Sequence, residues 1–212
     1  MADIYETIKE MVVGGKFKDI EEEVKRAVDS GADLNRLVNE AMIPAMDIVG
    51  KKFADGDIYV PEMLVSATTM KRGLDIIKPM LQSGDAENRG TIVMGTVKGD
   101  LHDIGKNLVS MMFEGAGFKI IDLGVDVKIE HLIDVLKKEA ADILGLSALL
   151  TTTMPEMKKV IEALTEAGLR DKVKVIVGGA PIDQRFADQI GADGYGEDAA
   201  EAVQLARRLI SK

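Results

Sequence analysis

Five short apolar runs alternate with amphipathic segments in the second part of the chain, and this alternation restricts the possible folds more than any other feature. Strand-like runs that each lead into a helical segment form a parallel sheet with helices on both faces. The sequence therefore predicts an α/β domain over residues 90–212, with a Rossmann-like (flavodoxin-like) parallel sheet. The predicted strands are 91–97, 118–122, 143–146, 173–177 and a weaker run at 193–195, and the predicted helices are 104–115, 128–139, 154–167, 183–189 and 198–211.

The first part of the chain shows helical periodicity and no strand pattern. Its four apolar stripes are separated by Gly14-Gly15, by Gly31 and by residues 54–57. Pro44 lies inside the third stripe and should kink that helix because proline has no backbone N–H, whereas Pro61 suits the first turn of the fourth. Four such helices with short connections predict a four-helix bundle over residues 1–85, with a polar interdomain linker at residues 83–90.

Composition excludes several classes of function. The chain has 212 residues and a net charge of −9, from 27 basic and 36 acidic residues, which opposes binding to nucleic acid or to an anionic membrane. It has no Cys, so disulfides, thiolate-bound zinc, Fe–S clusters and cysteine nucleophiles are excluded. No apolar run resembles a signal peptide or a membrane span, and a cytoplasmic protein is therefore expected.

The loop after the first predicted strand carries the first candidate site. In an α/β sheet, ligands bind outside the carboxyl ends of the strands. Asp100 lies two residues before His102, which places a carboxylate near the imidazole, where it would fix the tautomer and strengthen the other ring nitrogen as a metal ligand. Alternatively, the His only caps the next helix of a nucleotide-binding or flavodoxin-like domain that holds no metal.

Two more loops leave the same edge of the predicted sheet. The loop after the third strand is rich in hydroxyls, with Ser147, Thr151 and Thr153, and the loop after the fourth begins with Gly178-Gly179. Hydrogen-bonding groups and a close backbone approach fit a bulky ligand, and neither a Walker loop nor a Gly-x-Gly-x-x-Gly motif is present to favour a nucleotide. Alternatively, the hydroxyls cap the following helix and the glycines form an ordinary turn.

Taken in order, these motifs resemble a known signature. Asp100-x-His102-x-x-Gly105, then Ser147-x-Leu149, then Gly178-Gly179 is similar to the motif set of cobalamin-binding domains, in which the His replaces the cofactor's own base under cobalt. The segment from Phe53 to Glu62 resembles the helical cap over the corrin in methionine synthase and in small corrinoid proteins of methyl transfer systems. The resemblance covers essentially the whole chain.

The resemblance implies roles for individual residues. His102 would be the lower cobalt ligand and Asp100 would bond its other nitrogen, with Thr153 at the position where methionine synthase has a Ser. Phe53 and Val60, which equally fit core packing, would shield the upper face together with Met63. The implied cofactor-binding set is Gly99, Asp100, Leu101, His102, Asp103, Ile104 and Gly105 on the first loop, Ser147, Leu149, Thr151 and Thr153 on the second, Gly178 and Gly179 on the third, and Phe53, Val60 and Met63 on the cap.

The function that the resemblance implies is that of a cofactor-carrying subunit rather than a complete enzyme. Cobalamin or a related corrinoid, as methylcobalamin and cob(I)alamin, would accept a methyl group from a substrate-specific methyltransferase. A second methyltransferase would pass it to tetrahydrofolate or a thiol, and a reductive activase would restore the cofactor. The alternative is the cobalamin subunit of an adenosylcobalamin-dependent carbon-skeleton mutase, where no helical cap is expected. A cobalamin-dependent regulator would need a basic DNA-binding helix pair, which the acidic bundle does not offer.

Overall fold

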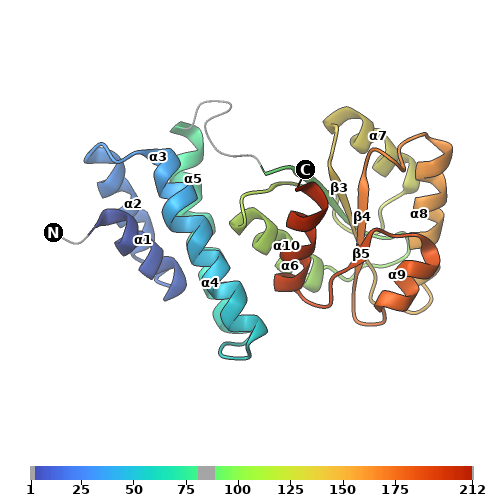
Figure 1. Ribbon diagram of the computed structural model, residues 1–212, viewed down its shortest axis with the longest axis horizontal. Coiled ribbons are helices and arrows are strands. Elements are labelled where there is room, and N and C mark those ends of the chain that lie inside the picture. Colours follow the sequence, from blue (N-terminus) through green and yellow to red (C-terminus); the bar gives the residue numbers. More distant parts are fainter. Residues whose placement is uncertain (1–2, 81–88, 212) are drawn as a thin grey trace. The chain divides into compact units, whose positions relative to one another are not determined.

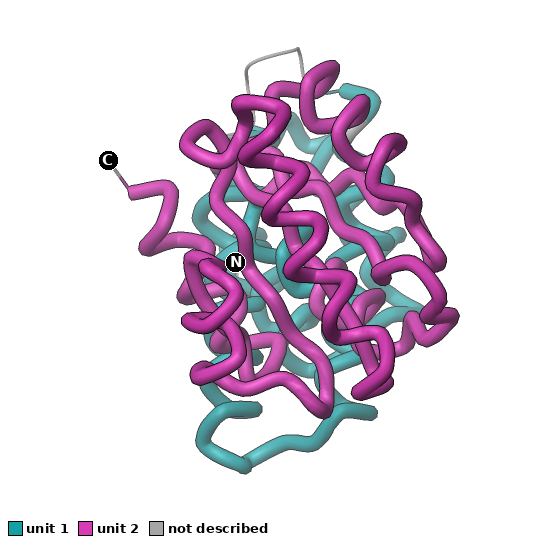
Figure 2. Tube along the Cα trace, turned by 90° about the vertical axis from the view of Figure 1, so that its right-hand side faces the viewer, with its two compact units in different colours: residues 1–88, 111–117 teal, residues 89–110, 118–212 magenta. Residues whose placement is uncertain are grey.

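The computed structural model describes residues 3–80 and 89–211 and divides into two compact units (Figure 2). Unit 1 consists of Met1–Asn88 with Met111–Gly117, and unit 2 of Arg89–Ser110 with Phe118–Lys212. The predicted linker at 83–90 lies outside the described residues except for its last two positions. The predicted domain limits, 1–85 and 90–212, therefore stay predictions.

Unit 2 contains a five-stranded sheet in the order β2-β1-β3-β4-β5, with every neighbouring pair parallel. The predicted strands are confirmed, with ends that differ by a residue or so. Val97, for example, falls outside β1 and forms an isolated bridge with Val127. The strands are β1 Thr91–Thr96, β2 Lys119–Asp122, β3 Ile143–Ser147, β4 Lys174–Gly178 and β5 Gly194–Tyr195; the helices are α6 Ile104–Gly115, α7 Ile129–Glu139, α8 Met154–Glu166, α9 Gln184–Ile190 and α10 Ala199–Ile210.

Both faces of the sheet are covered, as the unbroken apolar strands predict. The register pairs Val93 with Leu144 and Leu144 with Val175, so these side chains share one face. They form a buried cluster with Leu132 of α7 and Met157 of α8. Helices α7, α8 and α9 lie on this side of the sheet and α10 lies on the other (Figure 1). Ile92, Met94, Ile143 and Ile176, at the alternate positions, are also buried.

The strand order reverses between β1 and β3, and this reversal locates the site. β1 continues through α6 to β2 on one side, whereas β3 continues through α8 to β4 on the other. The loops that follow these two neighbouring strands therefore run in opposite directions and leave a crevice at the carboxyl edge, where α/β sheets bind ligands. The His102 loop and the hydroxyl-rich loop are these two loops.

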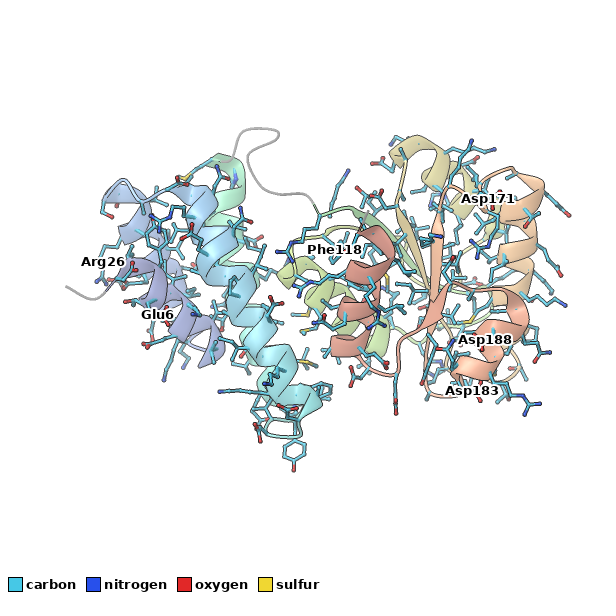
Figure 3. All side chains as sticks on the ribbon, in the orientation of Figure 1. Glu6, Arg26, Phe118, Asp171, Asp183 and Asp188 are labelled. Atoms are coloured by element: carbon cyan, nitrogen blue, oxygen red, sulfur yellow. The ribbon has the colours of Figure 1, made fainter. Side chains whose placement is uncertain are left out.

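The loop between β4 and α9, which begins at Gly179, ends at a capped helix. The side chain of Asp183, labelled in Figure 3, accepts a hydrogen bond of 2.7 Å from the backbone N–H of Phe186. Gly191, with φ of +78°, closes the helix in the left-handed conformation. The loop that begins at Gly179 is thereby held short between β4 and α9.

Unit 1 is helical, as predicted. Its buried side chains recur along the longer helices and include Ile8, Val12, Ile20, Val24, Leu37, Met42, Met46, Val49, Met63, Met70 and Leu74. Its helices are α1 Ile4–Val13, α2 Ile20–Asp29, α3 Leu34–Arg36, a π-helix at Leu37–Met42, α4 Ile43–Ala54, α5 Val60–Ile77 and a 3-10 turn at Lys78–Met80. None of the helices in the described part of the chain is long and apolar enough to cross a membrane.

At Pro44, where the sequence predicts a kink, the helix changes type. The six residues before Ile43 form a π-helix, and the N–H of Ile43 bonds to the carbonyl of Val38, five residues back. Pro44 cannot donate the next bond of an α-helical ladder, and a wider turn directly before it accommodates the missing donor. α4 then continues from Ile43 to Ala54. Pro61 lies in the first turn of α5, as predicted.

Candidate functional site

The imidazole of His102 has one nitrogen engaged and one open. Its Nδ1 lies 2.7 Å from Oδ1 of Asp100, and its backbone N–H donates to the same oxygen at 3.1 Å. Because a carboxylate oxygen can only accept, Nδ1 carries the proton in the neutral ring and Nε2 keeps its lone pair. No described residue bonds to Nε2, and the side chain is 51% exposed. Nε2 is therefore available to a metal.

Asp100 is completely buried, yet its second oxygen is fully engaged. Oδ2 accepts from the backbone N–H of Leu149 at 2.8 Å and of Leu150 at 3.3 Å, and from Oγ1 of Thr153 at 2.7 Å. Burial by itself raises the pKa of Asp100, but the hydrogen bonds from Leu149, Thr153 and His102 outweigh it and hold the pKa well below its usual range. The group is thus a charged carboxylate at neutral pH.

Thr153 connects the loop after β3 to the His102 loop after β1, at the point where the strand order reverses. It occupies the N-cap position of α8 but makes no side-chain capping bond there. Its hydroxyl lies instead 2.7 Å from Asp100 and 2.9 Å from the carbonyl of Leu150. The capping alternative therefore does not describe Thr153. Ser147 and Thr151 have no side-chain hydrogen bond to any described residue, so their hydroxyls are free for a ligand.

Two polar residues that the sequence analysis missed support the His102 loop. Thr96, completely buried at the end of β1, donates from Oγ1 to the carbonyl of His102 at 2.9 Å. Lys106 is also buried, and its Nζ contacts Asp122 at 2.5 Å and Asn107 at 2.7 Å. The sequence does show a hydroxyl at the end of a buried strand, Thr96, and a lysine in the first turn of a helix, Lys106. It does not show which residues these two side chains bond to.

Large exposed apolar side chains lie on the two loops that meet at Asp100. Leu101 is 72% exposed and Ile104 85%, while Leu149 and Leu150 on the facing loop are 43% and 41% exposed. Such a group of exposed apolar residues marks a binding surface rather than an ordinary exterior. Gly105 adds open space, because a Cβ there would contact nothing within 4 Å. This surface fits a broad, flat, largely apolar ligand.

The described residues place too few metal-binding side chains together to hold a metal ion by themselves. Within residues 3–80 and 89–211, no group of three or more His, Cys, Asp or Glu side chains is placed to hold one. A metal at Nε2 would take its remaining ligands from a cofactor or from water. A tetrapyrrole-type macrocycle provides four of them in a plane, and its apolar body matches the surface around His102.

Gly179 has a local structural reason to be glycine. Its φ is +130°, and a Cβ at this position would lie 1.9 Å from the carbonyl oxygen of Ala148. The backbone of the loop after β4 therefore packs directly on the loop after β3, which the ordinary-turn alternative also predicts. Gly178 is less crowded, with 3.3 Å between its Cβ position and the carbonyl oxygen of Gly196. The role of this pair toward a cofactor tail stays a prediction.

The three predicted cap residues lie in unit 1. Phe53 is partly buried in the last turn of α4, and Val60 is the first residue of α5 and is 41% exposed. Met63, one turn further along α5, is completely buried. The structure thus brings Phe53 and Val60 to the two ends of the same turn, and their role in shielding a cofactor stays a prediction.

Two family models match the chain, and both describe a B12 binding domain, one over residues 90–204 and the other over residues 4–78. A corrinoid protein of Desulfitobacterium hafniense (strain Y51) is 42% identical over 212 residues, which are 99% of this chain and 98% of that protein. Dimethylamine corrinoid protein 3 of Methanosarcina mazei is 48% identical over 167 residues, which are 78% of this chain and 100% of that protein.

Solved structures give the same result. A cobalamin-binding protein from Desulfitobacterium hafniense DCB-2 matches with a TM-score of 0.79 at 31% identity and covers 100% of both chains. A chain of the methanol:cobalamin methyltransferase complex MtaBC from Methanosarcina barkeri matches with a TM-score of 0.87 at 32% identity, over 99% of this chain and 80% of that chain. These similarities confirm the predicted succession of a helical part and a parallel sheet.

Proposed function

This chain belongs to the B12-binding corrinoid proteins of methyltransferase systems, and on that premise we propose that it carries a methyl group between two partner methyltransferases. A bound corrinoid supplies a cobalt atom that accepts and releases the methyl group. The observation that carries the proposal is the open Nε2 of His102, whose ring is held at Nδ1 by a buried carboxylate on a loop with exposed apolar side chains.

In this proposal His102 is the lower cobalt ligand and Asp100 sets its chemistry. The carboxylate keeps the proton on Nδ1, so that Nε2 presents a lone pair, and its charge makes Nε2 a stronger donor. The carboxylate of Asp100 would lie against Nδ1 of the ring whether or not Nε2 holds a metal. Thr153 holds Asp100 in place for both states.

The remaining residues of the surface would bind the cofactor and exclude water from it. Leu101, Ile104, Leu149 and Leu150 would contact the lower face of the macrocycle, which removes their apolar surface from water. The hydroxyls of Ser147 and Thr151 would hydrogen-bond the displaced tail of the cofactor. Phe53 and Val60 would cover the opposite face, and Met63, which is completely buried, would support them from within the helical unit.

For partners, we propose a substrate methyltransferase that acts on a methylamine or methanol. The similarity to a dimethylamine corrinoid protein and to a chain of the methanol:cobalamin methyltransferase complex supports this class of donor. A second methyltransferase, with tetrahydrofolate or a thiol as acceptor, and a reductive activase complete the proposed system. No observation favours the mutase alternative, since the helical family model matches residues 4–78 and the matched relative is a dimethylamine corrinoid protein.

A methyl transfer assay tests the proposal. The protein is loaded with hydroxocobalamin, reduced with Ti(III) citrate and mixed with a purified methylamine or methanol methyltransferase and its donor. We expect the visible spectrum to change to that of the methylated cofactor only when enzyme and donor are both present. The proposal fails if methylamines, methanol, betaine and aryl methyl ethers, each with its own methyltransferase, leave the spectrum unchanged. A marked preference for adenosylcobalamin would favour the mutase alternative.

Thr153→Val should weaken the site while Thr153→Ser preserves it. Valine has the same shape but cannot donate to Asp100, and a hydrogen bond to a buried charge is worth about 1.5–3 kcal/mol. We expect urea unfolding of the cofactor-free protein at pH 7 to show a loss of this size for Thr153→Val, and less than half of it for Thr153→Ser. Equal losses in the two variants would show that the hydroxyl of Thr153 contributes no more than its methyl group, and would contradict a dominant role for the hydrogen bond to Asp100.

A further inference from the structure

Asp126 makes two hydrogen bonds to the turn that carries Asp100. Its Oδ1 accepts from the backbone N–H of Gly99 at 2.7 Å, and its own backbone N–H donates to the carbonyl of Asp100 at 3.0 Å. The next residue continues the contact, because the N–H of Val127 donates to the carbonyl of Thr96 at 3.0 Å. The loop after β2 is therefore bonded along the turn on both sides of Lys98.

The turn itself needs this support. Asp100 donates from its backbone N–H to the carbonyl of Val97 at 3.1 Å, and Gly99 has a φ of +80°, as the third residue of a type II turn requires. Lys98 and Gly99 are exposed, so hydrogen bonds contribute more than burial to holding the two peptide planes before Asp100. At the other end of the His102 loop, Thr96 and Asn107 provide anchors, with Asn107 bonded to both the carbonyl and the side chain of Asp103.

The backbone of Asp126 shows that these bonds matter. Its φ is +51°, a conformation that is uncommon for residues other than glycine. Among the described residues only Ala140 shares this property, and Ala140 ends helix α7, where such a conformation is usual. Asp126 ends no helix. A glycine would adopt this conformation freely but would leave the N–H of Gly99 without its acceptor, whereas Asp supplies the acceptor and tolerates the conformation.

We propose that Asp126 is a positioning residue for the cofactor: by holding the Lys98-Gly99-Asp100 turn, it keeps the Asp100 carboxylate against Nδ1 of His102 and so keeps Nε2 directed at the corrinoid. The inference rests on the proposed ligation by His102. Among the described residues, the side chain of Asp126 forms its hydrogen bond with the backbone of Gly99 and not with the imidazole, so it acts through the backbone of the turn.

Three variants separate the hydrogen bond from the backbone conformation. Asp126→Asn keeps both an acceptor oxygen and tolerance of positive φ, Asp126→Gly keeps only the conformation, and Asp126→Ala keeps neither. Because Asp126 is exposed, all three are expected to fold, and urea unfolding checks this. If positioning by the acceptor is the cause, Asp126→Gly and Asp126→Ala should both be impaired and Asp126→Asn should be close to wild type.

The first measurement uses cofactor-free protein labelled with ¹⁵N, in which long-range ¹H–¹⁵N spectra report the tautomer of His102. We expect a single Nδ1–H form in wild type and Asp126→Asn and a mixture in Asp126→Gly. The second uses cobinamide, a corrinoid without its own base, and measures its retention. We expect retention about tenfold weaker in Asp126→Gly, as for the loss of one charged hydrogen bond, and within about twofold of wild type in Asp126→Asn.

The inference would be overturned if Asp126→Gly had the same His102 tautomer and the same cobinamide retention as wild type. It would also be overturned if Asp126→Asn lost as much retention as Asp126→Gly. Failure of the underlying ligation is recognised separately. If His102→Ala retains cobinamide with an unchanged spectrum, His102 is not the ligand, whereas the tautomer measurement on cofactor-free protein still decides whether Asp126 positions the imidazole.

Discussion

His102→Ala should fold normally and lose the only nitrogen that the site offers to cobalt. The chain contains two histidines, and the other, His131, lies exposed on α7. The side chain of His102 is half exposed, so its removal leaves the core intact. Loss of a residue that only supports a metal ligand weakens binding roughly 10–100-fold. We expect loss of the ligand His102 itself to weaken corrinoid retention by more than this.

Electron paramagnetic resonance of the Co(II) form provides the measurement. Cobinamide brings no nitrogen base of its own, so an axial nitrogen signal must come from the protein. Wild type should show a triplet splitting that becomes a doublet when its histidines carry ¹⁵N, and His102→Ala should show neither. His131→Gln is the matched control and should behave as wild type. An unchanged splitting in His102→Ala would assign the ligand elsewhere.

Asp100→Asn is expected to have the second largest effect on cobinamide retention. The reason is that the oxygen and the NH₂ group of the new amide must face different partners. The oxygen is required at the loop after β3, where Leu149, Leu150 and Thr153 all donate. The NH₂ group then faces His102 and can only donate to Nδ1, which moves the ring proton to Nε2. We expect roughly 10–100-fold weaker retention of cobinamide, with the Nε2–H tautomer visible in ¹⁵N spectra. Retention equal to wild type would contradict the proposed role of Asp100.

The same pair of proteins gives a prediction for pH. The folded state holds the pKa of Asp100 below its usual range, so the unfolded chain binds the proton more readily. The carboxylate therefore contributes stability above the unfolded value of about 3.9, and this contribution is lost as the pH falls through the lower folded value. In urea unfolding of cofactor-free protein, the difference between wild type and Asp100→Asn should be constant from pH 7 to 5 and shrink below pH 4. Parallel curves down to pH 3 would show that Asp100 does not titrate in this way.

The sequence predicted the sheet well because its strands are buried on both faces and stand out as apolar runs. It also predicted that Asp100, His102 and the Thr153 loop meet, since they follow strands that end at one edge. It could not predict the residues that hold these groups in place. The partners of Thr96, Lys106 and Asp126 lie up to 27 residues away, and no periodicity connects them. The π-helix before Pro44 was missed for a different reason, since a proline predicts an interruption but not its form.

Asp100 and the groups that stabilise its charge are far apart in the chain. Leu149 and Thr153 follow it by 49 and 53 residues, although their strands are neighbours in the sheet. Until the β3 loop has been synthesised, the carboxylate of Asp100 lacks the donors on Leu149 and Thr153 that hold it in place. The imidazole is therefore held in a single tautomer only after β3 has paired with β1. Insertion of the cofactor must accordingly follow synthesis of this domain, and no shorter fragment ending before Thr153 should retain a corrinoid.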